Sequence, residues 1–147
     1  MAQQLVIALT TGSAVKTVIN ENFTELYGSL TEVDGSASGA LTVANCKNTR
    51  VNNYGQAAEN AALTLPTAEA GLRFSAVIGT TQAGNTWKLT ADTNDKIYLD
   101  GIAGTDNQSV IVTPAISNSL DMYTFQTGAA SWDWIATTIT GTWTAGV

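Results

Sequence analysis

Short alternating segments separated by turn residues fill the chain from Ala40 onward, and they constrain its fold more than any other feature. In "LRFSAVIG", for example, Leu72 and Phe74 fall on one side of an extended backbone while Arg73 and Ser75 fall on the other. Glycine-, asparagine- and aspartate-rich turns such as "TQAGN" and "DGIAGTDN" lie between the segments. Strands at this spacing, with no helical stretch between them, predict an antiparallel β-sandwich or jelly-roll-like domain over residues 40–147.

One helix is predicted ahead of this β domain. Between Val15 and Val33 the apolar residues recur mostly every three or four positions, which is the pattern of a single helical stripe. The preceding "QLVIALT" is typical of a short strand, and "DGSASG" at residues 34–39 is typical of a flexible linker. Residues 1–39 are therefore predicted to form an anchoring strand, an oligomerising helix and a linker, which makes the chain all-β apart from one N-terminal helix.

The helical stripe predicts contacts with other chains. One register of it would form a coiled-coil seam containing Asn22, and a polar residue there would set register and oligomer state. The alternative is that the stripe packs on the chain's own sheet and leaves Asn22 exposed. The residues expected at the oligomer or anchor interface are Leu5, Ile7, Val15, Ile19, Asn22, Phe23, Leu26 and Leu30.

Charge and composition narrow the classes of partner. Charged residues are 12% of the chain, the net charge is −6, and the Lys and Arg residues are scattered singly. A nucleic-acid surface needs clustered cations, so we expect no nucleic-acid partner. No apolar run approaches the roughly 18 residues of a membrane span, so we expect no membrane partner either. A low charge content is common in subunits that hide surface against copies of themselves.

The residue types present argue against catalysis. The chain has no histidine and one cysteine, Cys46, which excludes Ser-His and Cys-His nucleophile pairs and zinc sites built on these ligands. We predict that the protein is not an enzyme and has no cofactor. Acidic and amide residues between Asp92 and Asp106 leave open a structural calcium ion, although ordinary turn chemistry explains them as well.

Four tryptophans require a choice between core and ligand contact. Trp132 and Trp134 share one face of a predicted strand, where buried rings would fill a sandwich core or a subunit interface. The alternative is that Trp132 or Trp134 is exposed and stacks on a glycan. Trp87 alternates with Leu89 and is predicted to be core, whereas Trp143 is expected to pack against a neighbouring subunit.

Two segments resemble structural proteins of tailed bacteriophages. "INENFTELY" is similar to an "N-x-NF-x-ELY" helix near the start of many fibre and virion proteins. "ALTLPTAEAGLRFSAVIGTTQAGNTWKLTA", followed by "DKIYLDG", "SWDWIA" and "TGTW", resembles a β module of phage fibres and decoration proteins. The resemblance implies a homotrimeric virion component, with a bundled N-terminal helix and a β-sandwich or jelly-roll head. The chain is too short for a fibre shaft, which favours a capsid decoration protein or a short head fibre.

The expected function is accordingly structural. The chain would self-associate, most simply as a homotrimer, and dock through its N-terminal segment on other virion proteins such as major capsid or tail components. It would be assembled in the host cytoplasm and located in the virion. The alternative is a tail-fibre or receptor- and glycan-binding module.

Overall fold

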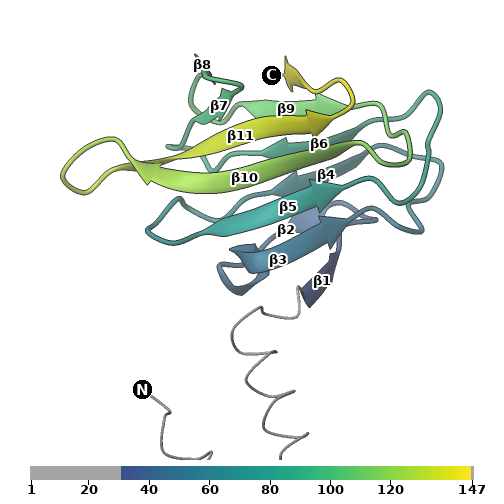
Figure 1. Cartoon of the computed structure of the whole chain (residues 1–147), viewed down its shortest axis with the longest axis horizontal. Helices are drawn as coiled ribbons and strands as arrows, with labels where there is room; N and C mark the ends of the chain where they lie inside the picture. Colours follow the sequence, from purple (N-terminus) through teal and green to yellow (C-terminus); the bar gives the residue numbers. More distant parts are fainter. Residues whose placement is uncertain (1–30, 147) are drawn as a thin grey trace, which may run out of the picture. The chain divides into compact units, whose positions relative to one another are not determined.

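Two β-sheets make up the part of the chain that the structure, a computed structural model, describes: residues 31–146 (Figure 1). Sheet A has the strand order β1-β3-β5-β10-β11-β7-β8, and sheet B has the order β12-β9-β6-β4-β2. The strands are β1 (Thr31–Asp34), β2 (Gly39–Ala40), β3 (Lys47–Asn52), β4 (Ala61–Thr64), β5 (Arg73–Val77), β6 (Trp87–Thr90), β7 (Ile97–Leu99), β8 (Ile102–Ala103), β9 (Ser109–Val112), β10 (Ser119–Gln126), β11 (Trp132–Thr140) and β12 (Thr144–Gly146). The predicted all-β character is confirmed for these residues.

The prediction that the sheets are antiparallel is wrong for the first half of this unit. From β1 to β6 the chain alternates between sheet A and sheet B, so the neighbours in each sheet are every second strand and run parallel. Antiparallel pairing is commoner later, in β10 with β5 and β11 and in β9 with β6 and β12, although β7 runs parallel to β11. The early turns cross between sheets instead of closing hairpins, and alternation of side chains alone does not distinguish the two.

The β unit begins at Thr31, within the segment predicted as the end of the helix and a linker. Val33 pairs with Val51 of β3 and packs against the core. Gly35 is buried, its N–H donates to the carbonyl of Asn52 at 2.8 Å, and its own carbonyl accepts the indole N–H of Trp87 at 2.7 Å. A Cβ at Gly35 would lie 2.9 Å from Val51 Cγ1, so only glycine fits here without a shift of the core.

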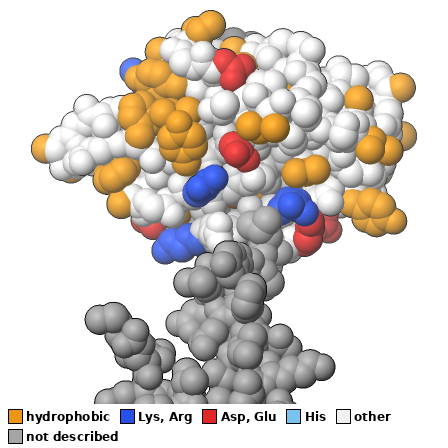
Figure 2. Space-filling model, in the orientation of Figure 1, with side chains coloured by type: hydrophobic (Ala, Val, Ile, Leu, Met, Phe, Trp, Pro, Cys, Tyr) orange, Lys and Arg blue, Asp and Glu red, His pale blue; other side chains and the backbone are white. Residues whose placement is uncertain are grey.

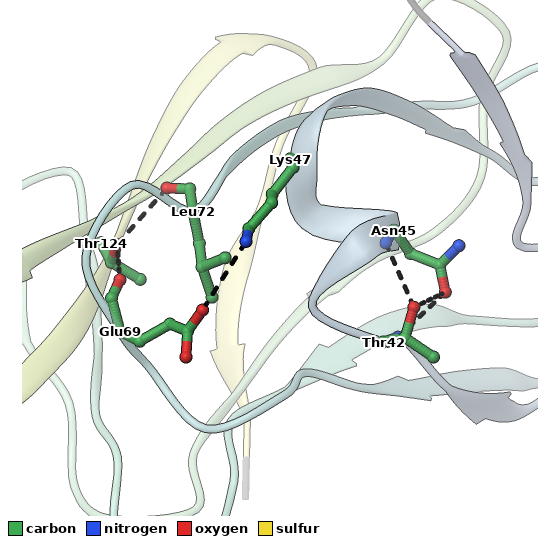
Figure 3. Close-up of polar contacts among 6 residues, drawn as sticks. All are labelled: Thr42, Asn45, Lys47, Glu69, Leu72 and Thr124. Atoms are coloured by element: carbon green, nitrogen blue, oxygen red, sulfur yellow. Dashed lines mark hydrogen bonds and ion pairs between the residues drawn. The ribbon is translucent and has the colours of Figure 1, made fainter.

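Residues 40–45, at the start of the predicted β domain, mostly form a turn instead of a strand. After the short β2, a 3-10 helix, η2, spans Ala44–Cys46. Thr42 and Asn45 hold this turn, because Thr42 N–H donates to Asn45 Oδ1 at 2.9 Å and Asn45 N–H donates to Thr42 Oγ1 at 3.2 Å (Figure 3). These side chains bond backbone N–H groups that would otherwise pair with a neighbouring β-strand. The exposed ion pair of Lys47 with Glu69, 4.0 Å apart, contributes little stability.

A single hydrophobic core lies between the two sheets and draws on both. The inward positions that the alternation predicted are buried, including Phe74 and Trp87. Trp87 packs edge-to-face on Trp143 with ring centroids 6.1 Å apart, and Phe74 packs in the same manner on Trp134 at 5.9 Å. Such pairs contribute beyond the area that they bury.

A buried amide network joins the loops that follow β3 and β5. The Oδ1 atom of Asn53 accepts the backbone N–H groups of Gly79 at 2.7 Å and Thr80 at 3.0 Å. Its Nδ2 atom donates to Gln56 Oε1 at 2.8 Å and to the carbonyl of Thr80 at 3.0 Å. Asn53 is fully buried, so this side chain replaces the ladder bonds that the two loops lack.

Candidate functional site

The predicted interface residues of the N-terminal segment lie outside the described residues. They are Leu5, Ile7, Val15, Ile19, Asn22, Phe23, Leu26 and Leu30. Their roles in oligomerisation and anchoring stay predictions.

The two tryptophans considered for glycan contact lie on the inner side of β11. Trp134 is fully buried against Phe74, so its ring has no exposed face to offer to a sugar. Its indole Nε1 has no hydrogen-bond partner among the described residues. Trp132 is half-buried and packs against the core. Trp143 is also buried in its own chain, beside Trp87.

An aromatic and apolar surface occupies the outer side of sheet A instead. In register, Tyr123 of β10 lies opposite Ile135 of β11, and Ile135 lies opposite Tyr98 of β7. Phe125 contacts Tyr98 edge-to-face with ring centroids 5.1 Å apart. Tyr123 is 39% exposed, and the other three side chains are half-buried. We call Tyr98, Tyr123, Phe125 and Ile135 the outer-face patch; Figure 2 shows hydrophobic side chains gathered over these strands.

A shallow hollow adjoins the outer-face patch and extends to β5. It has a volume of about 450 Å³ and is lined by Arg73, Asp121, Tyr123 and Thr137. Ser75 donates its hydroxyl to Asp121 Oδ1 at 2.7 Å, which fixes that carboxylate. The charged side chains of Arg73 and Asp121 therefore lie beside the exposed ring of Tyr123. This arrangement suits contact with another protein, and it also suits a ligand with a polar ring.

Sequence reasoning missed the outer-face patch, although the signal was present. In "DMYTFQ" the same alternation that points Met122 into the core points Tyr123 and Phe125 outward. Several apolar or aromatic residues that adjoin one another on the solvent side of a sheet often mark an interaction site. Reading both faces of each strand would have found this surface.

The acidic loops considered for calcium are occupied by turn and loop contacts. Asp95 accepts the backbone N–H of Ala68 at 2.6 Å, and Asp92 accepts the hydroxyl of Thr67. Burial raises the pKa of Asp95, and the nearby carboxylates of Asp92 and Asp133 add to this rise. Within residues 31–146 no group of three or more acidic, cysteine or histidine side chains is arranged to hold a metal ion.

Cys46 is fully buried. Burial raises the pKa of its thiol to about 12. Because the thiolate is the reactive form, this side chain is chemically inert in the folded unit and acts as a small apolar group.

Known proteins give no further guide to this surface. No family model matches the chain, and no curated protein or solved structure matches it. In the part of the chain that the structure describes, no helix is long and apolar enough to cross a membrane.

Proposed function

We propose that this chain is a structural protein of a bacteriophage virion, a capsid decoration or short head-fibre subunit that self-associates and docks through its N-terminal segment. The observation that carries the proposal is the outer-face patch. Tyrosine and phenylalanine on an exposed sheet face are the residues enriched in protein interfaces, and contiguous exposed apolar surface marks sites of association. The low charge content, 12%, fits a subunit that buries surface in an assembly.

The resemblance of "INENFTELY" to a phage helix motif supplies the second support, because a helix of this kind would provide an oligomerising segment before the β unit. The described unit starts at Thr31 with β1, an edge strand of sheet A.

A receptor- or glycan-binding module of a tail fibre is the second candidate. The hollow beside the outer-face patch favours it, because Arg73 and Asp121 could bind sugar hydroxyls while Tyr123 stacks on the ring. Copy number separates the locations: hundreds of copies per particle by quantitative mass spectrometry indicate the head, and a handful indicate the tail.

Introducing charge into the helical stripe is expected to break the assembly. Ile19→Glu with Leu26→Glu should convert the full chain from a trimer, three times its 15.3 kDa mass, to a monomer, because charges cannot be buried unpaired in a seam. Light scattering measures the mass. Thr17→Glu with Thr24→Glu adds the same charge at the same spacing on the other side of the predicted helix, and this control should stay trimeric. A monomeric wild-type chain at micromolar concentration contradicts the proposal.

Removing the outer-face patch tests its part in assembly. Tyr123→Ser with Ile135→Ser should shift the full chain toward smaller species at a given concentration, because interface aromatics dominate association energy. Sedimentation velocity gives the distribution, and a thermal scan checks that the fold persists. Ile139→Ser is the control, because Ile139 is an exposed apolar residue of β11 outside both the outer-face patch and the hollow. An unchanged distribution together with lost binding to host cells favours the glycan-binding alternative.

A further inference from the structure

A second feature lies away from the outer-face patch, at the edge of the unit where β7 and β8 of sheet A face β9 and β12 of sheet B. A cavity of about 360 Å³ opens there between the sheets. This volume falls within the roughly 300–1,000 Å³ of small-molecule sites. The side chains that give the cavity its apolar wall are Ile97, Leu99, Ile102, Ala103, Val110 and Trp143.

The inner wall of the cavity is held in place by the core. Ile97 and Val110 are 2% and 1% exposed. Trp143 packs on Trp87, and its Nε1 atom donates to the carbonyl of Thr140 at 3.2 Å. The indole therefore offers the cavity its apolar surface, and its one polar atom is already used.

The polar side chains of the lining are likewise bonded within the chain. Asp100 accepts both the backbone N–H and the hydroxyl of Thr138, each at 2.8 Å. The Ser109 hydroxyl shares a hydrogen bond of 2.9 Å with Thr90, and Gln108 Oε1 accepts the backbone N–H of Thr105 at 2.9 Å. Several polar atoms of the lining are therefore already paired within the chain, which leaves the apolar wall as the main surface for a ligand to contact.

The cavity exists because both bordering strands are short and carry small residues. β8 ends in Ala103 and β12 contains Ala145, and both of these side chains line the opening. Larger residues at either position would close the gap between the sheets. Ile102, 76% exposed, stands at the same opening and offers further apolar contact.

We propose that this inter-sheet cavity binds a small, uncharged, apolar molecule such as an alkyl chain or an aromatic ring. The volume and the apolar wall set the size and the class of the ligand. The carboxylate of Asp100 in the lining and the net charge of −6 disfavour an anionic group. The inference is independent of the assembly role proposed above.

Titration of the full chain with N-phenyl-1-naphthylamine, a neutral fluorescent probe, tests the site. We expect saturable enhancement with one site per chain, displaced by 1-decanol and much less by decanoate. Ala103→Phe should weaken probe binding about tenfold or more by filling the opening. Ala40→Phe is the matched control, because Ala40 is also exposed in a two-residue edge strand, β2, and it should bind as the wild type does.

Three results would overturn the proposal: no saturable binding, full binding in Ala103→Phe, or loss of binding in Tyr123→Ser, which would place the probe on the outer-face patch. Decanoate competing as well as 1-decanol would overturn the preference for uncharged ligands. Thermal scans confirm that the variants fold. If Ala103→Phe does not fold, Ala145→Leu on the opposite side of the cavity replaces it in the test, and it should weaken probe binding to the same extent.

Discussion

Replacing Asn53 by alanine is expected to lower the free energy of unfolding by about 3 to 5 kcal/mol. The substitution removes all four hydrogen bonds of a fully buried amide. It leaves the half-buried backbone N–H groups of Gly79 and Thr80 without their acceptor, and a donor that is shielded from water and unpaired destabilises the folded state by its desolvation penalty. Urea denaturation of the full chain measures the change.

Asn94→Ala is the control for this prediction. Asn94 is exposed in the loop before β7, and no hydrogen bond of its side chain is found among the described residues. Its replacement should change stability by less than about 0.5 kcal/mol. Equal effects of the two substitutions would mean that the Asn53 network does not hold the loops together.

Two tryptophan substitutions form a second, internally matched comparison. Trp87→Phe should cost about 1 to 2 kcal/mol more than Trp134→Phe. Both rings are fully buried, one in each sheet, and both pack edge-to-face on another aromatic ring. They differ in the indole N–H, because that of Trp87 donates to the buried carbonyl of Gly35 at 2.7 Å.

The Trp134 indole N–H has no partner among residues 31–146, so phenylalanine removes an unpaired donor there and loses mainly packing volume. Chemical denaturation of the two variants, followed by far-ultraviolet circular dichroism, gives the difference. Equal costs would show that the bond to Gly35 does not tie the start of the unit to sheet B.

Side-chain alternation predicted which residues face the core much better than it predicted which strands are neighbours. The inward positions Leu72, Phe74 and Leu89 are all buried. Alternation of side chains shows which face of a strand each residue occupies. The strand that it pairs with depends instead on whether the following turn stays in one sheet or crosses to the other. Among the described strands, the expected local pairing is found in the short β7–β8 pair and in the β10–β11 hairpin, which is closed by a bond from Thr127 N–H to the carbonyl of Ser131.

The boundary at Thr31 could not be read from pattern alone. Val33 fits the helical stripe and also fits a strand, and a segment as short as "TEVD" carries little propensity of its own. Pairing with β3 and the contacts of Gly35 decide the outcome, and these involve residues distant in the sequence. Tertiary contacts override local preference in such cases.

The candidate sites also differ in whether the sequence pattern could have predicted them. The outer-face patch was readable, since its residues alternate with core residues along β10 and β11. The cavity could not be predicted, because it lies between two short strands, β8 and β12, that belong to different sheets. The predicted N-terminal stripe stays a prediction, to be tested by the charge substitutions described above.

The alternation of the first six strands between the sheets has a mechanical consequence. Thr31 is where the preceding chain enters, and β1 is the edge strand of sheet A, while β2 is the edge strand of sheet B. A pulling force applied through the N-terminal segment would meet these edges in turn, so the unit would unravel strand by strand without first extracting an interior strand. The resistance of the unit to this force would then depend on the β1–β3 pair and on the hydrogen bond between the Trp87 indole and the Gly35 carbonyl.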